Sequence, residues 1–245
     1  MSTPRILATS GGFVPGPVQG TARLGQMILG ALALTNTQRP RVCLVETASG
    51  DPREWYAVLY EAFNAAGCDV TELKLFTQPS ADPTERLTSC DFVWVGGGSV
   101  ANLLALWRLH GVDLAMREAW ERGVILGGVS AGSLCWHAGG TTDSFGPTLQ
   151  PVTNALGFLP YANGVHYDSE EQRRPLLHHL MKNATLGPLA FATDDHVGIW
   201  YEGIEPTLVV GDTDMDPTTG PAAYRVELID GDVRETRVGV GGSFA

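Results

Sequence analysis

The sequence predicts an α/β fold in which a mostly parallel β-sheet carries helices on both faces. Strand-like apolar runs alternate with helix-length amphipathic segments through the first half of the chain. These runs are continuously apolar, which is typical of strands buried on both faces. The length of 245 residues, with 44% hydrophobic and 18% charged residues, fits a single α/β domain spanning residues 1–245.

The first half shows a regular β-α-β rhythm, and each predicted strand is a short apolar run while each predicted helix is amphipathic. In chain order the predicted elements are a strand at Ile6–Thr9, a helix at Leu24–Leu34, a strand at Val42–Glu46, a helix at Pro52–Ala66, a strand at Asp69–Leu75, a strand at Phe92–Val95, helices at Ser99–His110 and Asp113–Arg122, and a strand at Val124–Leu126.

The second half has a different character. Thr141–Ala162 is rich in glycine and proline and is predicted to be a loop, and a helix at Glu170–Lys182 follows it. Short strands come next, ending in a hairpin around Asp230-Gly231, a strong two-residue turn signal. We therefore expect a small antiparallel appendage at the C-terminal end.

Bulk composition narrows the range of partners. The net charge of −11 disfavours nucleic acid and anionic membrane surfaces. No stretch approaches a membrane span, and the N-terminal residues lack the pattern of a signal peptide. Four cysteines without a CxxC pair suggest free thiols in a reducing compartment. We expect a cytoplasmic protein with a small-molecule or short-peptide partner, and a homodimer remains an open alternative.

One glycine-flanked serine is the leading candidate for a nucleophile. Ser130 lies in Gly128-Val129-Ser130-Ala131-Gly132, between a predicted strand and the start of a helix. Such an elbow exposes the serine hydroxyl and directs backbone amides outward at a helix N-terminus. The alternative is a helix N-cap serine after a glycine turn, and the motif alone does not separate the two.

A base and an acid are also available. His166 follows a short turn downstream of the elbow, where a loop can bring it over Ser130 as a general base. Two carboxylates are candidates for orienting it, Asp143 and Asp195, and the sequence does not rank them.

A second glycine cluster, Gly96-Gly97-Gly98-Ser99, ends a predicted strand and opens a helix, so its free amides are candidates for an oxyanion hole. It also fits a relaxed dinucleotide fingerprint, but the next strand, Val124–Leu126, ends in glycines where a ribose-binding acid belongs. We expect no cofactor.

Five short motifs in order resemble peptidase E (α-aspartyl dipeptidase) and its cyanophycinase relatives, a family of serine peptidases, over most of the chain. They are Val95-Gly96-Gly97-Gly98-Ser99-x-x-Asn102-Leu103-Leu104, Gly128-Val129-Ser130-Ala131-Gly132-Ser133, Thr141-Thr142-Asp143-Ser144, His166-Tyr167-Asp168 and Thr193-Asp194-Asp195. The resemblance implies the flavodoxin-like sheet shared with class I glutamine amidotransferases, and hydrolysis of short peptides through an acyl-enzyme.

The resemblance also implies residue roles. It makes Ser130 the nucleophile, His166 the base and Asp195 the acid of a Ser-His-Asp triad, with oxyanion donors at the amides of Gly98 and Ala131.

For substrate binding, the resemblance implies an arginine after the histidine motif that recognises an aspartyl carboxylate. Arg173, or alternatively Arg174, takes this place, and Asp143 is the other acid of the motif set. The spacing from His166 to Arg173 is shorter than in peptidase E itself, so dipeptide hydrolysis and aspartyl preference are separate predictions.

The remaining features favour structural interpretations. Cys135, one turn past Ser130, is an ordinary buried thiol on this reading. Asp212-x-Asp214-x-Asp216 lacks the glycine that a calcium loop needs, so we expect no metal. Two other functions stay open. One is an esterase or amidase using the same elbow, although the chain order of base and acid disfavours it. The other is a non-catalytic ligand-binding module.

Overall fold

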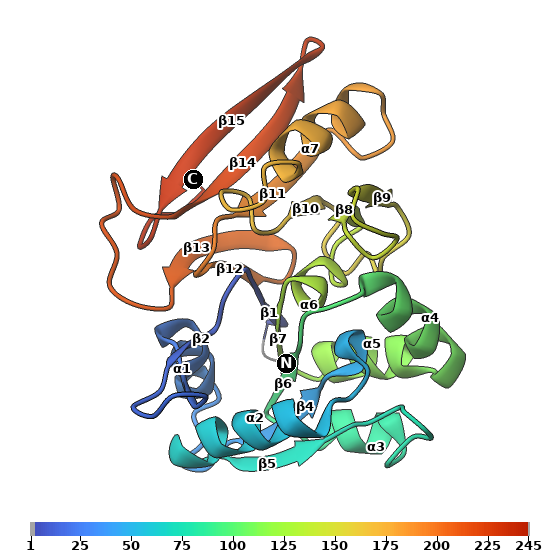
Figure 1. The fold of residues 1–245 in the computed structure, drawn as a ribbon, viewed down its shortest axis with the longest axis vertical. Coiled ribbons are helices and arrows are strands. Elements are labelled where there is room, and N and C mark those ends of the chain that lie inside the picture. Colours follow the sequence, from blue (N-terminus) through green and yellow to red (C-terminus); the bar gives the residue numbers. More distant parts are fainter. Residues whose placement is uncertain (1–2, 245) are drawn as a thin grey trace.

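The computed structural model describes residues 3–244 and contains two sheets joined through a shared core (Figure 1). The larger sheet has seven strands in the order β13-β12-β1-β7-β6-β4-β5. Its strands are β1 (Arg5–Thr9), β4 (Arg41–Val45), β5 (Asp69–Glu72), β6 (Phe92–Val95), β7 (Ile125–Val129), β12 (Val197–Glu202) and β13 (Glu205–Gly211). The neighbours from β1 to β5 pair in parallel, and β12 and β13 add an antiparallel edge.

Helices cover both faces of this sheet because successive residues of its strands are buried on opposite sides. In β4, Val42 and Leu44 pack in one apolar cluster, whereas Cys43 and Val45 pack in another. The first cluster includes α1 (Gln26–Leu34) and α2 (Arg53–Ala65). The second includes α3 (Pro83–Thr88), α4 (Val100–His110), α5 (Val112–Glu121) and α6 (Ala131–Leu134). The continuous apolar runs in the sequence reflect this double burial.

The second sheet has six strands in the order β15-β14-β11-β10-β8-β9. They are β8 (Gly139–Thr142), β9 (Gln150–Val152), β10 (Ala162–Gly164), β11 (Leu189–Thr193), β14 (Ala222–Ile229) and β15 (Asp232–Gly239). Strands β8, β10 and β11 are parallel, and the others pair antiparallel. Helix α7 (Arg173–Lys182) packs on this sheet through Leu177 and Met181.

The predicted α/β fold class is confirmed, and the C-terminal strands are more integrated than a simple appendage. Strands β12 and β13 complete the first sheet, while β14 and β15 form the predicted hairpin, with Ile229 opposite Asp232 and positive φ angles at Asp230 and Gly231. Positive φ at both central residues is the geometry that Asp-Gly turns favour.

Several elements are too short to be predicted from the sequence patterns. The segment expected to be a loop contains β9, whose Pro151 sits in an edge strand, where its missing amide costs little. A small hairpin of β2 (Phe13–Pro15) and β3 (Ala22–Leu24) and the helix α3 were not predicted. Among residues 3–244, none of the helices combines the length and the apolar character that crossing a bilayer requires.

Candidate active site

Ser130 occupies a sharp turn between strand β7 and the short helix α6. Its backbone has φ 56° and ψ −112°, a sparsely populated conformation for a residue with a side chain. The glycines on either side allow the chain to pass closely. A Cβ on Gly128 would lie 2.4 Å from the carbonyl oxygen of Gly132, and one on Gly132 would lie 2.3 Å from that of Val95. The elbow therefore depends on the absence of these side chains.

The second glycine cluster lies directly beside this serine. A Cβ built on Gly97 would be 3.3 Å from the Ser130 Cβ. Gly98 has φ 130° and packs closely against the carbonyl oxygen of Ala48. Ser99 caps α4, because its side-chain oxygen accepts from the amide of Asn102 at 3.2 Å. Because Ala131 is the first residue of α6, its amide has no acceptor within the helix. The Ala131 amide and the glycine loop thus flank the serine.

His166 and Asp195 form a close pair. His166 follows β10 with φ 52°, and its Nδ1 lies 2.5 Å from Oδ1 of Asp195, in the turn after β11. With Nδ1 protonated, the imidazole donates to the carboxylate and keeps Nε2 available as a base. The amide of Asp195 donates to Oδ1 of Asp168 at 2.9 Å, which fixes the acid in turn. The His166 and Asp195 side chains are 23% and 36% exposed, so solvent and small molecules reach them.

The backbones of Ser130 and His166 are hydrogen-bonded to two consecutive residues at the end of β1. The Ser130 amide donates to the carbonyl oxygen of Thr9 at 3.0 Å, and the His166 amide donates to the hydroxyl of Ser10, also at 3.0 Å. The Ser10 hydroxyl in turn lies 2.7 Å from that of Thr193. The carboxyl end of β1 therefore joins the elbow of the first sheet to the histidine loop of the second.

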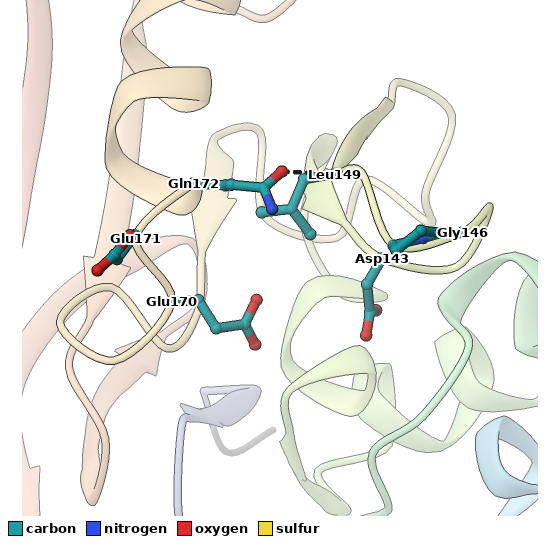
Figure 2. Close-up of a pocket in the computed structure, with 7 residues that line it drawn as sticks. Asp143, Gly146, Leu149, Glu170, Glu171 and Gln172 are labelled. Atoms are coloured by element: carbon teal, nitrogen blue, oxygen red, sulfur yellow. Dashed lines mark hydrogen bonds between the residues drawn. The ribbon is translucent and has the colours of Figure 1, made fainter.

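Asp143 lines a cavity of about 650 Å³, and among the described residues His166 Nδ1 pairs with Asp195 and not with Asp143. The cavity lies between the 143–149 loop and the turn that starts at His166, where the amide of Glu170 donates to the His166 carbonyl oxygen. Asp143 and Glu170 point toward the same gap (Figure 2). With Glu171 they give the cavity an acidic lining. Asp195, and not Asp143, is thus the carboxylate in contact with His166.

Both candidate substrate arginines have acidic partners. Arg173 is 2% exposed, donates from Nε and Nη2 to the two carboxylate oxygens of Glu170 at 2.8 and 3.2 Å, and also donates to the carbonyl oxygen of Thr141. Arg174 points away from Glu170, stacks on Tyr167 and pairs with Glu235 at 2.7 Å. Neither guanidinium is presented to the cavity without a counter-charge.

Comparison with known proteins identifies the family. The profile of peptidase family S51 matches residues 6–209. The chain belongs to peptidase family S51. The predicted resemblance to peptidase E and its relatives is confirmed, and the family is one of peptidases.

Relatives of this S51 chain include the uncharacterized peptidase YgaJ of Bacillus subtilis (strain 168), which is 36% identical over 230 residues, 94% of each chain. Peptidase E of Shewanella denitrificans is 28% identical over 137 residues, covering 53% of this chain and 58% of the relative.

Two solved structures share the fold of this S51 chain. A peptidase from an acI-B1 actinobacterium aligns with a TM-score of 0.72 at 15% identity, covering 99% of this chain and 97% of the other. A protein provisionally named peptidase E from Listeria monocytogenes EGD-e aligns with a TM-score of 0.60 at 17% identity, covering 86% and 99%.

The structure also shows residues around the candidate site of this S51 chain that sequence reasoning missed. The Ser10 hydroxyl accepts from the His166 amide, and the Asp168 carboxylate accepts from the Asp195 amide. Both residues lie in sequence patterns from which they could have been predicted. Ser10 precedes two glycines at the end of the first strand, and Asp168 belongs to the histidine motif. Glu170, which neutralises Arg173, could not have been predicted in this way, because the contact depends on how the loop turns into α7.

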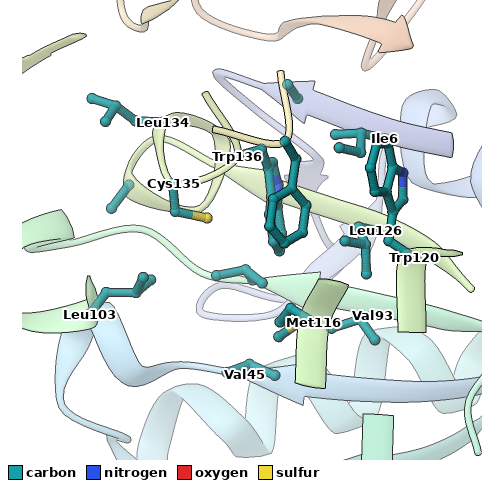
Figure 3. Close-up of a cluster of buried hydrophobic side chains, with 14 of the residues drawn as sticks. Ile6, Val45, Val93, Leu103, Met116, Trp120, Leu126, Leu134, Cys135 and Trp136 are labelled. Carbon is teal, nitrogen blue, oxygen red and sulfur yellow. The ribbon is translucent and has the colours of Figure 1, made fainter. Parts of the chain in front are cut away.

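Cys135 lies beneath the elbow and packs with Leu134 and Trp136 in the larger core cluster (Figure 3). Its thiol donates to the carbonyl oxygen of Gly132 at 3.3 Å. Complete burial raises the pKa of the Cys135 thiol well above its ordinary value, which keeps it protonated. In this S51 chain its place is therefore in the apolar packing under Ser130.

Proposed function

We propose that the chain is a serine peptidase that hydrolyses short peptides through a Ser130-His166-Asp195 triad. The observation that carries the proposal is the 2.5 Å contact between His166 and Asp195 on a loop tied, through Thr9 and Ser10, to a strained and half-exposed Ser130. A side chain held in such a backbone conformation at a strand-to-helix turn is typical of an activated nucleophile.

In the proposed reaction, His166 Nε2 takes the proton of the Ser130 hydroxyl as its oxygen attacks the peptide carbonyl. The imidazolium that forms is stabilised by the Asp195 carboxylate. The amides of Ala131 and Gly98 donate to the oxyanion of the tetrahedral intermediate. His166 then protonates the leaving amine, and a water molecule, activated by the same imidazole, hydrolyses the acyl-enzyme.

The acidic cavity beside His166 offers a place for part of the substrate, and its lining bears on residue preference. An N-terminal aspartyl group would bring a further negative charge next to Asp143 and Glu171. It would also have to displace Glu170 from Arg173 before that arginine could bind it. We therefore propose short-peptide hydrolysis as the activity, with an aspartyl preference only where the substrate carboxylate replaces Glu170.

A library of dipeptides tested against the wild type and Ser130→Ala examines the activity. We expect the substitution to lower kcat by about 10³-fold or more while the thermal unfolding profile stays the same, because only the attacking oxygen is lost. Ser169→Ala is the matched control, since Ser169 is exposed on the loop after His166. Equal hydrolysis by wild type and Ser130→Ala would overturn the proposed mechanism.

A further inference from the structure

One buried carboxyl group near the site has no role in the reaction described so far. Glu46 directly follows β4 and is 1% exposed. Within the described part of the chain, its Oε1 atom is buried without a hydrogen-bond partner. A buried carboxyl oxygen without a partner costs free energy, so its retention calls for a physical reason.

Glu46 contacts the glycine loop that flanks Ser130. A Cβ built on Gly96 would lie 1.9 Å from Oε2 of Glu46, so the carboxyl fills the space that a side chain at this position would need. The backbone around it supports the same loop. The Gly96 amide donates to the carbonyl oxygen of Val45 at 3.0 Å, and the Ser99 amide donates to that of Ala48 at 2.9 Å. The segment from Val45 to Ala48 thus supports the loop Gly96–Ser99 through backbone hydrogen bonds.

The surroundings of Glu46 favour its neutral form. Burial, and next the nearby carboxylate of Asp51, raise the pKa of Glu46 to about 8, while the Ser49 hydroxyl and the Trp55 indole oppose the shift. Tyr56 also lies beside Glu46, and the ammonium of Lys74 lies over the Tyr56 ring, 4.8 Å from its centroid. The Tyr56 hydroxyl donates to Asp51, and the Glu46 amide donates to that hydroxyl. At pH 7 the Glu46 carboxyl is therefore mainly protonated.

We propose that Glu46 is a positioning residue for the proposed peptidase reaction, whose uncharged carboxyl supports the glycine loop without placing a negative charge beside the oxyanion. This inference rests on the function proposed above. A carboxylate in this weakly solvated place would repel the charge that develops on the substrate oxygen, because Coulomb interactions are only weakly screened in the interior. Ionisation of Glu46 should therefore weaken stabilisation of the transition state more than binding of the neutral substrate.

The test is the pH dependence of kcat/KM for wild type and Glu46→Gln, measured from pH 6 to pH 10 with the dipeptide hydrolysed fastest in the library screen. We expect the wild type to lose about tenfold in kcat between pH 7 and pH 9, as Glu46 ionises, with little change in KM. Glu46→Gln should retain its activity over this interval, because the amide fills the same space and does not ionise. Glu46→Ala, which leaves the loop unsupported, should lower kcat at every pH.

Glu54→Gln is the matched control, because it makes the same substitution at an exposed position on α2. Its pH profile should match that of the wild type. An alkaline loss of the same size in Glu46→Gln would overturn the inference while leaving the peptidase proposal intact. If neither peptide hydrolysis nor fluorophosphonate labelling of Ser130 is detectable in the wild type, the proposed function falls and the inference falls with it.

A stability measurement separates charge from packing. The pKa of Glu46 in the folded protein, about 8, lies above its ordinary value of 4.5, so the native state binds the extra proton between these values. The wild type should therefore lose stability as the pH rises from about 4.5 through 8. Glu46→Gln should lack this loss, so that its Tm relative to the wild type increases across the interval. A constant Tm difference would contradict the assigned charge state.

Discussion

The two sides of the candidate site are held in place by opposite means. On the nucleophile side, Ser130 is fixed by backbone packing against backbone, which is possible only because Gly128 and Gly132 lack side chains. On the base side, His166 is fixed by polar side chains, with Ser10 accepting from its backbone amide and Asp195 in contact with its ring.

Because of this difference, we expect substitutions on the nucleophile side to lower stability and substitutions on the base side to lower activity. Adding atoms on the nucleophile side strains the fold, since closely packed backbone has no room to adjust. Changing His166 or Asp195 on the base side should leave the fold intact and alter the chemistry, because both side chains are partly exposed. The following substitutions examine this contrast, beginning with the largest expected effect.

Asp195→Asn should lower kcat by about 10³ to 10⁴-fold with little change in Tm, because an amide at this position favours the wrong histidine tautomer. Steady-state kinetics and thermal unfolding together measure both parts of this expectation.

Asp143→Asn is the control, and it also decides between the two acids that the sequence left open. Asp143 faces the cavity and not His166, so a loss of less than about tenfold is expected from the weakened binding of substrate alone. A larger loss in Asp143→Asn than in Asp195→Asn would reverse our assignment of the orienting acid.

Gly132→Ala should act on the other side of the comparison, by destabilising the fold. Its Cβ would meet the carbonyl oxygens of Val95 and Gly96 at 2.3 and 3.0 Å, both of them backbone atoms. We expect a loss of about 2 to 3 kcal/mol in the free energy of unfolding, which denaturant titration measures. Gly187→Ala has open space around its Cβ and should stay within about 0.5 kcal/mol of the wild type. Similar stability in the two variants would show that the elbow tolerates side chains.

Glu170→Gln should have the smallest effect on activity. We expect it to change the substrate preference and not to lower the overall rate. Removing the charge that pairs with Arg173 frees the guanidinium to bind a substrate carboxylate. We expect kcat/KM for Asp-Xaa dipeptides to rise by about threefold to tenfold relative to Ala-Xaa dipeptides, in a competition assay. Glu171→Gln removes an equal charge from the same cavity without touching Arg173, and an equal rise in that variant would dismiss the arginine as the cause.

Features that depend on residues close together in the sequence could be predicted from it, whereas features that depend on contacts between distant segments could not. The helices α2 and α4 and the buried parallel strands were predictable because the spacing of their apolar residues is local, as is the Ser99 cap of α4. The elbow at Ser130 was predictable for the same reason. The contact of Asp195 with His166 was left open against Asp143, because it depends on how two loops meet across the fold.

Other features depend on pairings that no local pattern encodes. Strand β9 is three residues long and contains a proline, so its pairing with β8 decides its state. The engagement of Arg173 by Glu170 depends on the turn into α7, and the burial of Glu46 depends on the approach of Gly96. In each case a contact between separate segments sets the chemistry of the residue.

The segment 194–196 carries the chain from β11, in the second sheet, to β12, in the first. Asp195 therefore occupies the crossover between the two halves, while its histidine belongs to one half alone. Phe191 of β11 and Tyr201 of β12 flank this crossover, and their rings lie 6.1 Å apart in the shared core. A smaller side chain at either position is therefore expected to shift Asp195 relative to His166.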